Sequence, residues 1–340
     1  MSKWMTIAGE ARQATTIGAG LVFLVIGSLL IWPMPVANAL SFAFFSIVEI
    51  APLVGTGILI AAWAVASDAD VRIAHAFEGR MAISVIIASA IGAVTPVCGV
   101  TVLPLMAGML ATGVPLAPVM AFWLASPITD PAMLATTAAT LGYGFALGKT
   151  MAALGLGLWG GAVTIGLSGR SWITEPLRDN AVVTTIRATR CGEAGPFEPF
   201  IWRNSGRRHR FARQAAATSR LILVCLFPAF AAEYVLNAVL TPEALISFLG
   251  KDAWWAIPFA VFIGAPAYLD GYAALPLTRG LVDHGMSQGA AMAFLVSGGV
   301  VSVWGALAIL PVLRVRPFML YLALALSGSM LAGYLFEWAI

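Results

Sequence analysis

Apolar runs separated by short polar turns follow one another along the chain, and their lengths predict helices. A hydrocarbon core about 30 Å thick is crossed by roughly 20 apolar residues in a helix. Runs that supply all or part of such a crossing lie near Thr16–Trp32, Leu40–Ala66, Val114–Ser126, Met133–Leu147, Met151–Leu167, Leu221–Leu240, Trp254–Leu269, Tyr272–Val282, Gly289–Leu310 and Phe318–Trp338. This pattern predicts an all-α fold, a polytopic membrane helical bundle.

The stretch from Met81 to Thr112 fits a single crossing poorly. Its 32 residues would extend about 48 Å as one straight helix, too long for one upright crossing and too short for two. The segment Thr95–Gly99, which contains Pro96, interrupts the run, and Pro104 interrupts it again. We therefore expect two half-length helices that meet at a break inside the bilayer.

The same motif recurs 172 positions downstream, as from Ile91 to Ile263. The first copy comprises Ile91-Gly92-Ala93, Gly99, Leu103-Pro104-Leu105, Gly108, Gly113 and Met120-Ala121-Phe122; the second comprises Ile263-Gly264-Ala265, Gly271, Leu275-Pro276-Leu277, Gly280, Gly285 and Met292-Ala293-Phe294. Apolar helices match readily in Leu and Ala, whereas Gly and Pro at fixed offsets indicate duplication. We predict two repeats, each with a broken or half-length helix pair.

Composition supports the membrane assignment, and the distribution of charge suggests an orientation. Hydrophobic residues make up 60% of the chain and charged residues 10%, whereas soluble domains carry about 25% charged residues. Ten arginines and only four acidic residues lie between Gly169 and Arg220. An arginine excess beside membrane spans indicates a cytoplasmic loop. Anionic lipid headgroups and this rule account for the arginines, so we expect membrane lipids and no nucleic acid as partners.

The arginine-rich loop divides the chain into three predicted regions. These are an N-terminal transmembrane repeat over residues 1–168, a cytoplasmic loop over residues 169–216 and a C-terminal transmembrane repeat over residues 217–340. Lys3 and Arg12 also favour a cytoplasmic N-terminus, so two spans precede the first broken element and one span separates the loop from the second. The two copies then enter the membrane from opposite sides, which makes the repeat inverted.

The two breaks are the predicted site, because a break frees backbone groups that hydrocarbon cannot satisfy. Such a break persists only inside protein or beside a water-filled cavity. Cys98 and Asp270 occupy equivalent repeat positions. A carboxylate within the bilayer needs a partner or a proton, so Asp270 is predicted as a proton carrier or cation ligand, with a helix cap in a wet vestibule as the alternative. Cys98 is either a ligand or a small buried apolar residue.

Other acidic residues also fall in or near apolar runs. Glu49 lies in the middle of the second run, and Asp130 lies between two prolines that exclude a continuous helix. Together with Asp270 they are our proton-coupling candidates, while Glu233 is expected nearer a helix end. Lys149 is either a charge partner for such an acid or a residue that snorkels to the interface.

Signatures of ordinary enzyme chemistry are missing from the sequence. It contains no Walker motif, His-Glu-x-x-His, Cys-x-x-Cys or Gly-x-Ser-x-Gly. The three cysteines show neither metal-ligand spacing nor a disulfide framework. We expect no enzyme activity, no cofactor and no metal site.

Several motifs resemble those of the predicted-permease family that includes ArsP. They are Thr95-Pro96-Val97-Cys98-Gly99-Val100-Thr101-Val102-Leu103-Pro104-Leu105, Gly113, Ala121-Phe122 and Ser126-Pro127 in the first half, and Gly264-Ala265-Pro266-Ala267-Tyr268, Leu275-Pro276-Leu277, Gly285 and Ala293-Phe294 in the second. The resemblance implies a substrate site formed by Thr95, Pro96, Cys98, Gly99, Thr101, Tyr268, Asp270 and Gly271. The family's Thr-Pro-x-Cys-Ser-Cys run is reduced here to the single Cys98, although trivalent arsenic favours paired thiolates.

The resemblance implies a secondary permease of the bacterial cytoplasmic (inner) membrane. We expect proton-coupled export of a small solute, with a trivalent organoarsenical or related metalloid as the substrate class that the resemblance suggests. One alternative is an uncoupled channel or facilitator, in which the same two breaks would form a selective constriction. A further alternative is an accessory subunit that docks a partner protein, or a second copy of the chain, through the arginine-rich loop.

Overall fold

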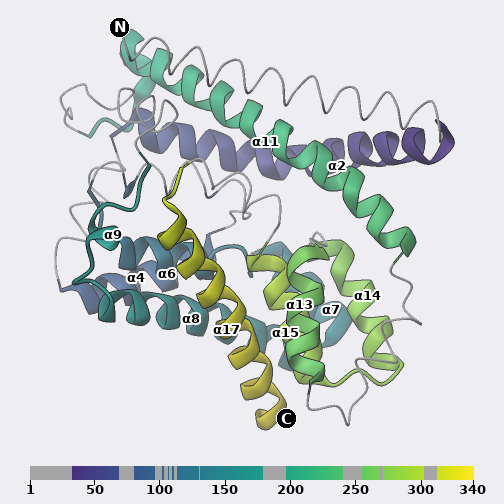
Figure 1. Cartoon of the computed structure of the whole chain (residues 1–340). Helices are drawn as coiled ribbons and strands as arrows, with labels where there is room; N and C mark the ends of the chain where they lie inside the picture. The colour runs from purple at the N-terminus through teal and green to yellow at the C-terminus, as the bar shows by residue number, and fades with distance from the viewer. Residues whose placement is uncertain are drawn as a thin grey trace, which may run out of the picture.

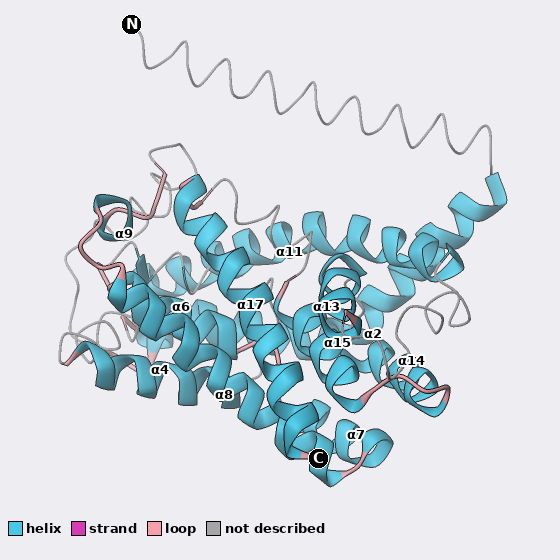
Figure 2. Ribbon diagram, turned by 60° about the horizontal axis from the view of Figure 1, so that its bottom comes forward, coloured by secondary structure: helices cyan, strands magenta, loops and turns pink. Residues whose placement is uncertain are grey.

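The computed structural model describes residues 33–68, 80–95, 102, 106, 109–110, 113–129, 131–178, 197–239, 255–267, 271–301 and 312–340. Within these ranges the chain is helical and forms no strand, apart from one isolated bridge between Leu177 and Leu313 (Figure 2). The elements are α2 (Pro33–Ala66), α4 (Met81–Val94), α6 (Leu116–Ala125), α7 (Pro131–Leu141), α8 (Tyr143–Gly166), α9 (Ser171–Thr174), η1 (Ile201–Arg203), α11 (Ser205–Val239), α13 (Ala256–Ala267), α14 (Gly271–Asp283), α15 (Gln288–Val300) and α17 (Val315–Ala339). The all-α prediction is confirmed, and the predicted span Thr16–Trp32 lies outside the described residues.

The helix boundary between the predicted spans Met133–Leu147 and Met151–Leu167 is placed differently in the structure. The break falls at Gly142, whose φ of +97° is readily adopted only by glycine. As a result α7 ends at Leu141, and α8 continues without interruption from Tyr143 through the residues where the sequence pattern suggested a gap.

Helices α2 and α11 pack along each other on one side of the molecule (Figure 1). They have 34 and 35 residues, and α11 begins inside the range assigned to the loop. An ion-pair cluster holds their ends together: Arg207 lies 2.8 Å from Asp68 and 3.1 Å from Glu198, and Arg210 lies 3.1 Å from Asp68. Because Asp68 and Arg207 are both buried, each needs the other's charge. Arginines of the loop therefore serve in part to fix α11 to the end of α2.

The remaining helices form two packed groups. Helices α4, α6 and α8 contact one another, as do α13, α15 and α17, while α17 also packs on α8 (Figure 1). The 14 residues of α4 extend only about 21 Å, and α6, α13 and α15 are shorter still. Among the described residues, α17 is the one helix that is both long and apolar enough to cross a membrane. Short apolar helices therefore form much of the interior.

Elements 172 positions apart begin at matching residues. Helices α6 and α15 start at Leu116 and Gln288, and α8 and α17 start at Tyr143 and Val315. The turns before α6 and α15 also match, since Gly113 and Gly285 have φ of +90° and +107°. In the first turn the amide of Val114 donates to the carbonyl of Met109, in the second Met286 donates to Leu281, and both bonds measure 3.0 Å.

A close backbone approach occurs at matching glycines in the two groups. A Cβ atom on Gly92 of α4 would lie 2.7 Å from the carbonyl oxygen of Phe122 in α6. A Cβ atom on Gly264 of α13 would lie 2.6 Å from the carbonyl oxygen of Phe294 in α15. These contacts leave no room for a methyl group, because the neighbouring atom belongs to a helix backbone. The helix pairs thus pack at a separation that requires glycine.

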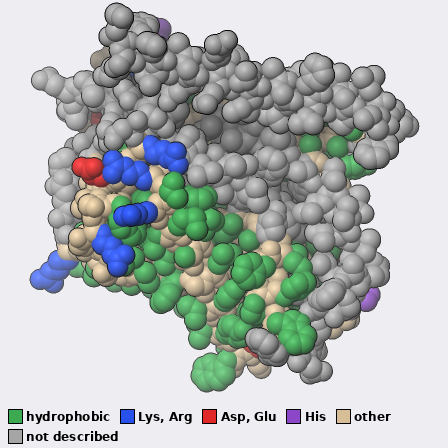
Figure 3. All heavy atoms as spheres, in the orientation of Figure 1, with side chains coloured by type: hydrophobic (Ala, Val, Ile, Leu, Met, Phe, Trp, Pro, Cys, Tyr) green, Lys and Arg blue, Asp and Glu red, His purple; other side chains and the backbone are tan. Residues whose placement is uncertain are grey.

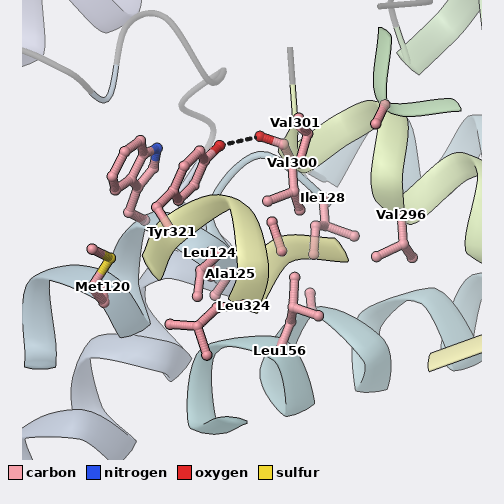
Figure 4. Close-up of a cluster of buried hydrophobic side chains, with 14 of the residues drawn as sticks. Met120, Leu124, Ala125, Ile128, Leu156, Val296, Val300, Val301, Tyr321 and Leu324 are labelled. Carbon is pink, nitrogen blue, oxygen red and sulfur yellow. Dashed lines mark hydrogen bonds between the residues drawn. The ribbon is translucent and has the colours of Figure 1, made fainter. Parts of the chain in front are cut away.

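The cores of the two groups are centred on α6 and α15. Every residue of α6 is buried, and all residues of α15 from Gly289 to Val300 are buried except Gly299, which is half-buried. Side chains of α6, α8, α15 and α17 meet in one apolar cluster, in which Leu124, Leu156 and Leu324 lie together (Figure 4). The two groups of helices therefore share a continuous core.

We predict that Gly92→Ala and Gly264→Ala each destabilise the protein by about 1–3 kcal/mol, because the helices must move apart to admit the methyl group. Thermal unfolding of the full chain in detergent measures the effect. Gly155→Ala in α8 is the matched control, since a Cβ atom there meets no atom within 4 Å, and we expect it to be neutral or stabilising by up to about 1 kcal/mol. Equal melting temperatures for all three variants would contradict the close-approach argument.

Candidate functional site

The structure places a minority of the residues predicted for the site. Thr95 directly follows α4, Gly271 is the first residue of α14, and Glu49 lies on α2 with an exposed side chain. Seven further predictions lie outside the described residues: Pro96, Cys98, Gly99, Thr101, Asp130, Tyr268 and Asp270. Whether Cys98 and Asp270 share a cavity therefore stays a prediction. Of the described residues, Thr95 and Gly271 lie next to these positions in the sequence.

The two groups of helices meet through pairs of residues that are 172 positions apart. A Cβ atom on Gly299, near the end of α15, would lie 3.1 Å from the carbonyl oxygen of Pro127, just after α6. A Cβ atom on Gly328 of α17 would press on the side chain of Leu156 in α8. Ile128 and Val300, a third pair at this offset, belong to the same apolar cluster (Figure 4). Pro127 and Leu156 thus each meet the residue 172 positions further along the chain.

Helices α8 and α17 cross in opposite directions at this junction. The rings of Phe145, near the start of α8, and Phe336, near the end of α17, are 5.1 Å apart. At the other end, the segment that follows α9 pairs with the segment before α17, where Arg314 donates to the carbonyl of Pro176 at 2.8 Å. The middle of the crossing is the contact between Leu156 and Gly328. The two helices are therefore antiparallel.

Threonine hydroxyls bond to the last carbonyl groups of α4 close to this junction. Thr129, which is buried, donates its hydroxyl to the carbonyl of Ala93 at 2.7 Å and so ties the segment after α6 to the end of α4. The hydroxyl of Thr95 donates to the carbonyl of Ile91 within α4. The carboxyl end of a helix carries a partial negative charge. Such ends can bind a cation or a proton donor, as broken helices in transporters do.

A polar side chain from α17 supports the end of α15. Tyr321 is buried, stacks on Trp123 with ring centroids 3.7 Å apart, and donates its hydroxyl to the carbonyl of Val300, the last residue of α15 (Figure 4). This bond satisfies a carbonyl that a helix end leaves without an intrahelical partner. Tyr321 therefore stabilises a helix end within an apolar environment.

Lys149 of α8 occupies the position equivalent to Tyr321, and sequence reasoning had left its place open. Only 1% of its surface is exposed. It lies in the second turn of α8, inside the bundle, so of the two alternatives for Lys149, snorkelling to the interface is wrong. The signal that could have identified it is that Lys149 is the one charged residue of α8 and lies 172 positions before Tyr321. Because a cation inside an apolar bundle is costly, Lys149 joins the functional candidates.

Metal-binding chemistry finds no support among the residues that the structure describes. No group of three or more His, Cys, Asp or Glu side chains lies close enough there to hold a metal ion. A groove of about 1150 Å³ between α8 and α17 is lined by apolar residues such as Leu147, Met151 and Leu335. None of the predicted site residues lines this groove, so it lies apart from the junction.

We predict that Tyr321→Phe lowers the unfolding free energy by about 1–3 kcal/mol, because the carbonyl of Val300 loses its donor in a buried environment. Tyr334→Phe, on the same helix with a side chain that is exposed, is the matched control and should have no effect. Thermal unfolding of both variants measures the difference. A Tyr321→Phe protein as stable as the Tyr334→Phe protein would show that this bond contributes nothing.

Comparison with known proteins places the chain in a family. The sequence profile ArsP_1, described as a predicted permease, matches residues 35–338. The UPF0718 protein MJ0584 of Methanocaldococcus jannaschii is 27% identical over 135 residues, which span 40% of this chain and 37% of that protein, just over a third of its length. No solved structure matches the chain. The profile covers both predicted breaks and the junction between them, and the protein belongs to this family of predicted permeases.

Proposed function

We propose that this protein is a secondary permease that moves a small solute across the bacterial cytoplasmic membrane by alternating access between two inverted half-units. The half-units correspond to the predicted repeats, residues 1–168 and 217–340, joined by a cytoplasmic loop over residues 169–216. Membership of a permease family supports transport. The observation that carries the inverted arrangement is the set of contacts between residues and their own counterparts.

Those contacts support a two-fold axis that lies in the membrane plane. Around a two-fold axis, a residue can touch the equivalent residue of the other half-unit only if both lie close to the axis. Equivalent residues that lie farther from the axis are farther apart from each other. Pro127 with Gly299, and Leu156 with Gly328, are in contact. Phe145, by contrast, meets Phe336, which lies nearly a full helix length from its equivalent Pro317. Antiparallel α8 and α17 therefore fit inverted units, which can open one central site to each face in turn.

We place the solute path where the helix ends converge on this axis. Thr95 directly precedes Pro96 and the first break, and Gly271 directly follows Asp270 in the second. We assign proton coupling to Asp270 and Asp130 rather than to Glu49, because the side chain of Glu49 is exposed on α2. A trivalent organoarsenical is the substrate class to test first, with Cys98 as its thiolate ligand.

The coupling proposal predicts that Asp270→Asn abolishes the response of transport to a pH gradient. Purified protein in proteoliposomes is given a trivalent methylarsenical with and without an imposed gradient, and flux is followed by arsenic content. The matched control is Asp283→Asn, because Asp283 is exposed and paired with Arg279 at 3.0 Å on the surface of α14. We expect wild-type coupling in the control and at least a tenfold loss of gradient-driven flux in Asp270→Asn, about 1.4 kcal/mol or more.

Two outcomes of the same assay would contradict the proposal. Gradient-driven flux unchanged in Asp270→Asn would exclude this carboxylate from coupling. Flux that fails to saturate with substrate and ignores the gradient in the wild type would indicate a channel instead. Absence of any arsenical flux while other metalloids are moved would retain the permease and change its substrate.

A further inference from the structure

A groove lies at the end of the bundle where α8 leads into α9 and α17 begins. Its volume is about 650 Å³, which falls within the range of small-molecule sites. The lining residues are Leu167, Arg170, Trp172, Val315, Arg316, Met319, Leu320 and Ala323. Because α17 is long and apolar enough to cross a membrane, we place its first turn, with Arg316, at a membrane surface. The groove thus runs from that surface along an apolar helix.

The mouth of this groove is strongly basic. Arg170 and Arg316 both line it and are exposed. Next to them, Arg178 donates to the carbonyl of Leu313 at 2.7 Å, and Arg314 lies 3.5 Å from Glu175. Among the described residues of this end, these four arginines and one glutamate carry a net charge of about three positive units. Figure 3 shows basic side chains gathered at one end of the molecule, beside an apolar surface.

The opposite end of the α8–α17 crossing provides an internal comparison. The apolar groove there is lined by Gly144, Leu147, Gly148 and Met151. These residues lie 172 positions before Arg316, Met319, Leu320 and Ala323 of the basic groove. The same crossing therefore forms with glycine in place of Arg316, so packing does not require arginine at that position. The arginine is available for a ligand.

We propose that the basic groove binds an anionic phospholipid of the surrounding membrane. The phosphate lies between the guanidinium groups of Arg170 and Arg316, which suit bidentate binding of phosphate oxygens. An acyl chain follows Met319, Leu320 and Ala323 along α17, and Trp172 lies at the level of the headgroups, where indole rings are favoured. Free phosphate would use only the basic half of the groove, whereas a phospholipid matches both halves.

Native mass spectrometry of the full chain in detergent tests this proposal by titration with phosphatidylglycerol or phosphatidylcholine. The variant Arg170→Gln/Arg316→Gln is compared with Arg208→Gln/Arg213→Gln, which removes the same charge from exposed positions of α11. We expect the wild type and the α11 variant to prefer phosphatidylglycerol. We expect the groove variant to bind it about thirty-fold more weakly, as for the loss of two arginines at a membrane surface.

The acyl chain is tested separately by Ala323→Phe, which fills the apolar half and keeps both arginines. It should also weaken phosphatidylglycerol binding, and it decides the case if the double variant does not fold. Equal losses in the groove and α11 variants, or wild-type binding by Ala323→Phe, would overturn the proposal. So would displacement of the lipid by an equal concentration of inorganic phosphate, which would identify a simple anion site.

Discussion

In each half of the molecule a helix lies against the backbone carbonyl of its neighbour at a glycine, Gly92 in α4 and Gly264 in α13. Lipid offers no hydrophobic driving force between helices, so close packing of small residues must supply the attraction. The third helix of each half also packs through glycine, since Gly157 of α8 meets the carbonyl of Ala121 and Gly333 of α17 meets Ala293. These contacts bring α6 and α15 to the centre, where the halves join.

The short helices that result have ends inside the bundle, and this constraint links the fold to its proposed function. Each helix end leaves carbonyl groups without intrahelical partners, and hydrocarbon cannot satisfy them. Tyr321 satisfies one such carbonyl at the end of α15, and Thr129 satisfies another in α4. Lys149 is buried at the position equivalent to Tyr321. The two halves therefore share a geometry but differ chemically at this position.

Much of the architecture could be predicted from the sequence because glycine and proline act locally. The end of α4 at Val94 agrees with the break predicted at Thr95, and the glycines matched at an offset of 172 mark the close approaches in both halves. The helix boundary at Gly142 was not predicted, because one glycine among many in an apolar run shows no sign of its backbone conformation.

The contacts that depend on distant parts of the chain could not be predicted. The pair between Asp68 and Arg207 joins residues 139 positions apart, and the sequence did not predict a partner for that arginine within the chain. Burial of Lys149 likewise depends on how α8 meets the other half. Local patterns thus identify the helices and their breaks, whereas the partners of charged residues follow from tertiary packing.

The central claim is that the halves are inverted about an axis between Leu156 and Gly328, and disulfide cross-linking tests it most directly. In a background without the three native cysteines, Leu156→Cys/Gly328→Cys should cross-link in membranes, because Leu156 Cγ is 3.1 Å from a Cβ atom at Gly328. Gly144→Cys/Arg316→Cys, also 172 positions apart, should not, since these residues lie at opposite ends of the antiparallel crossing. Cross-linking of both pairs, or of the second alone, would contradict the inverted arrangement.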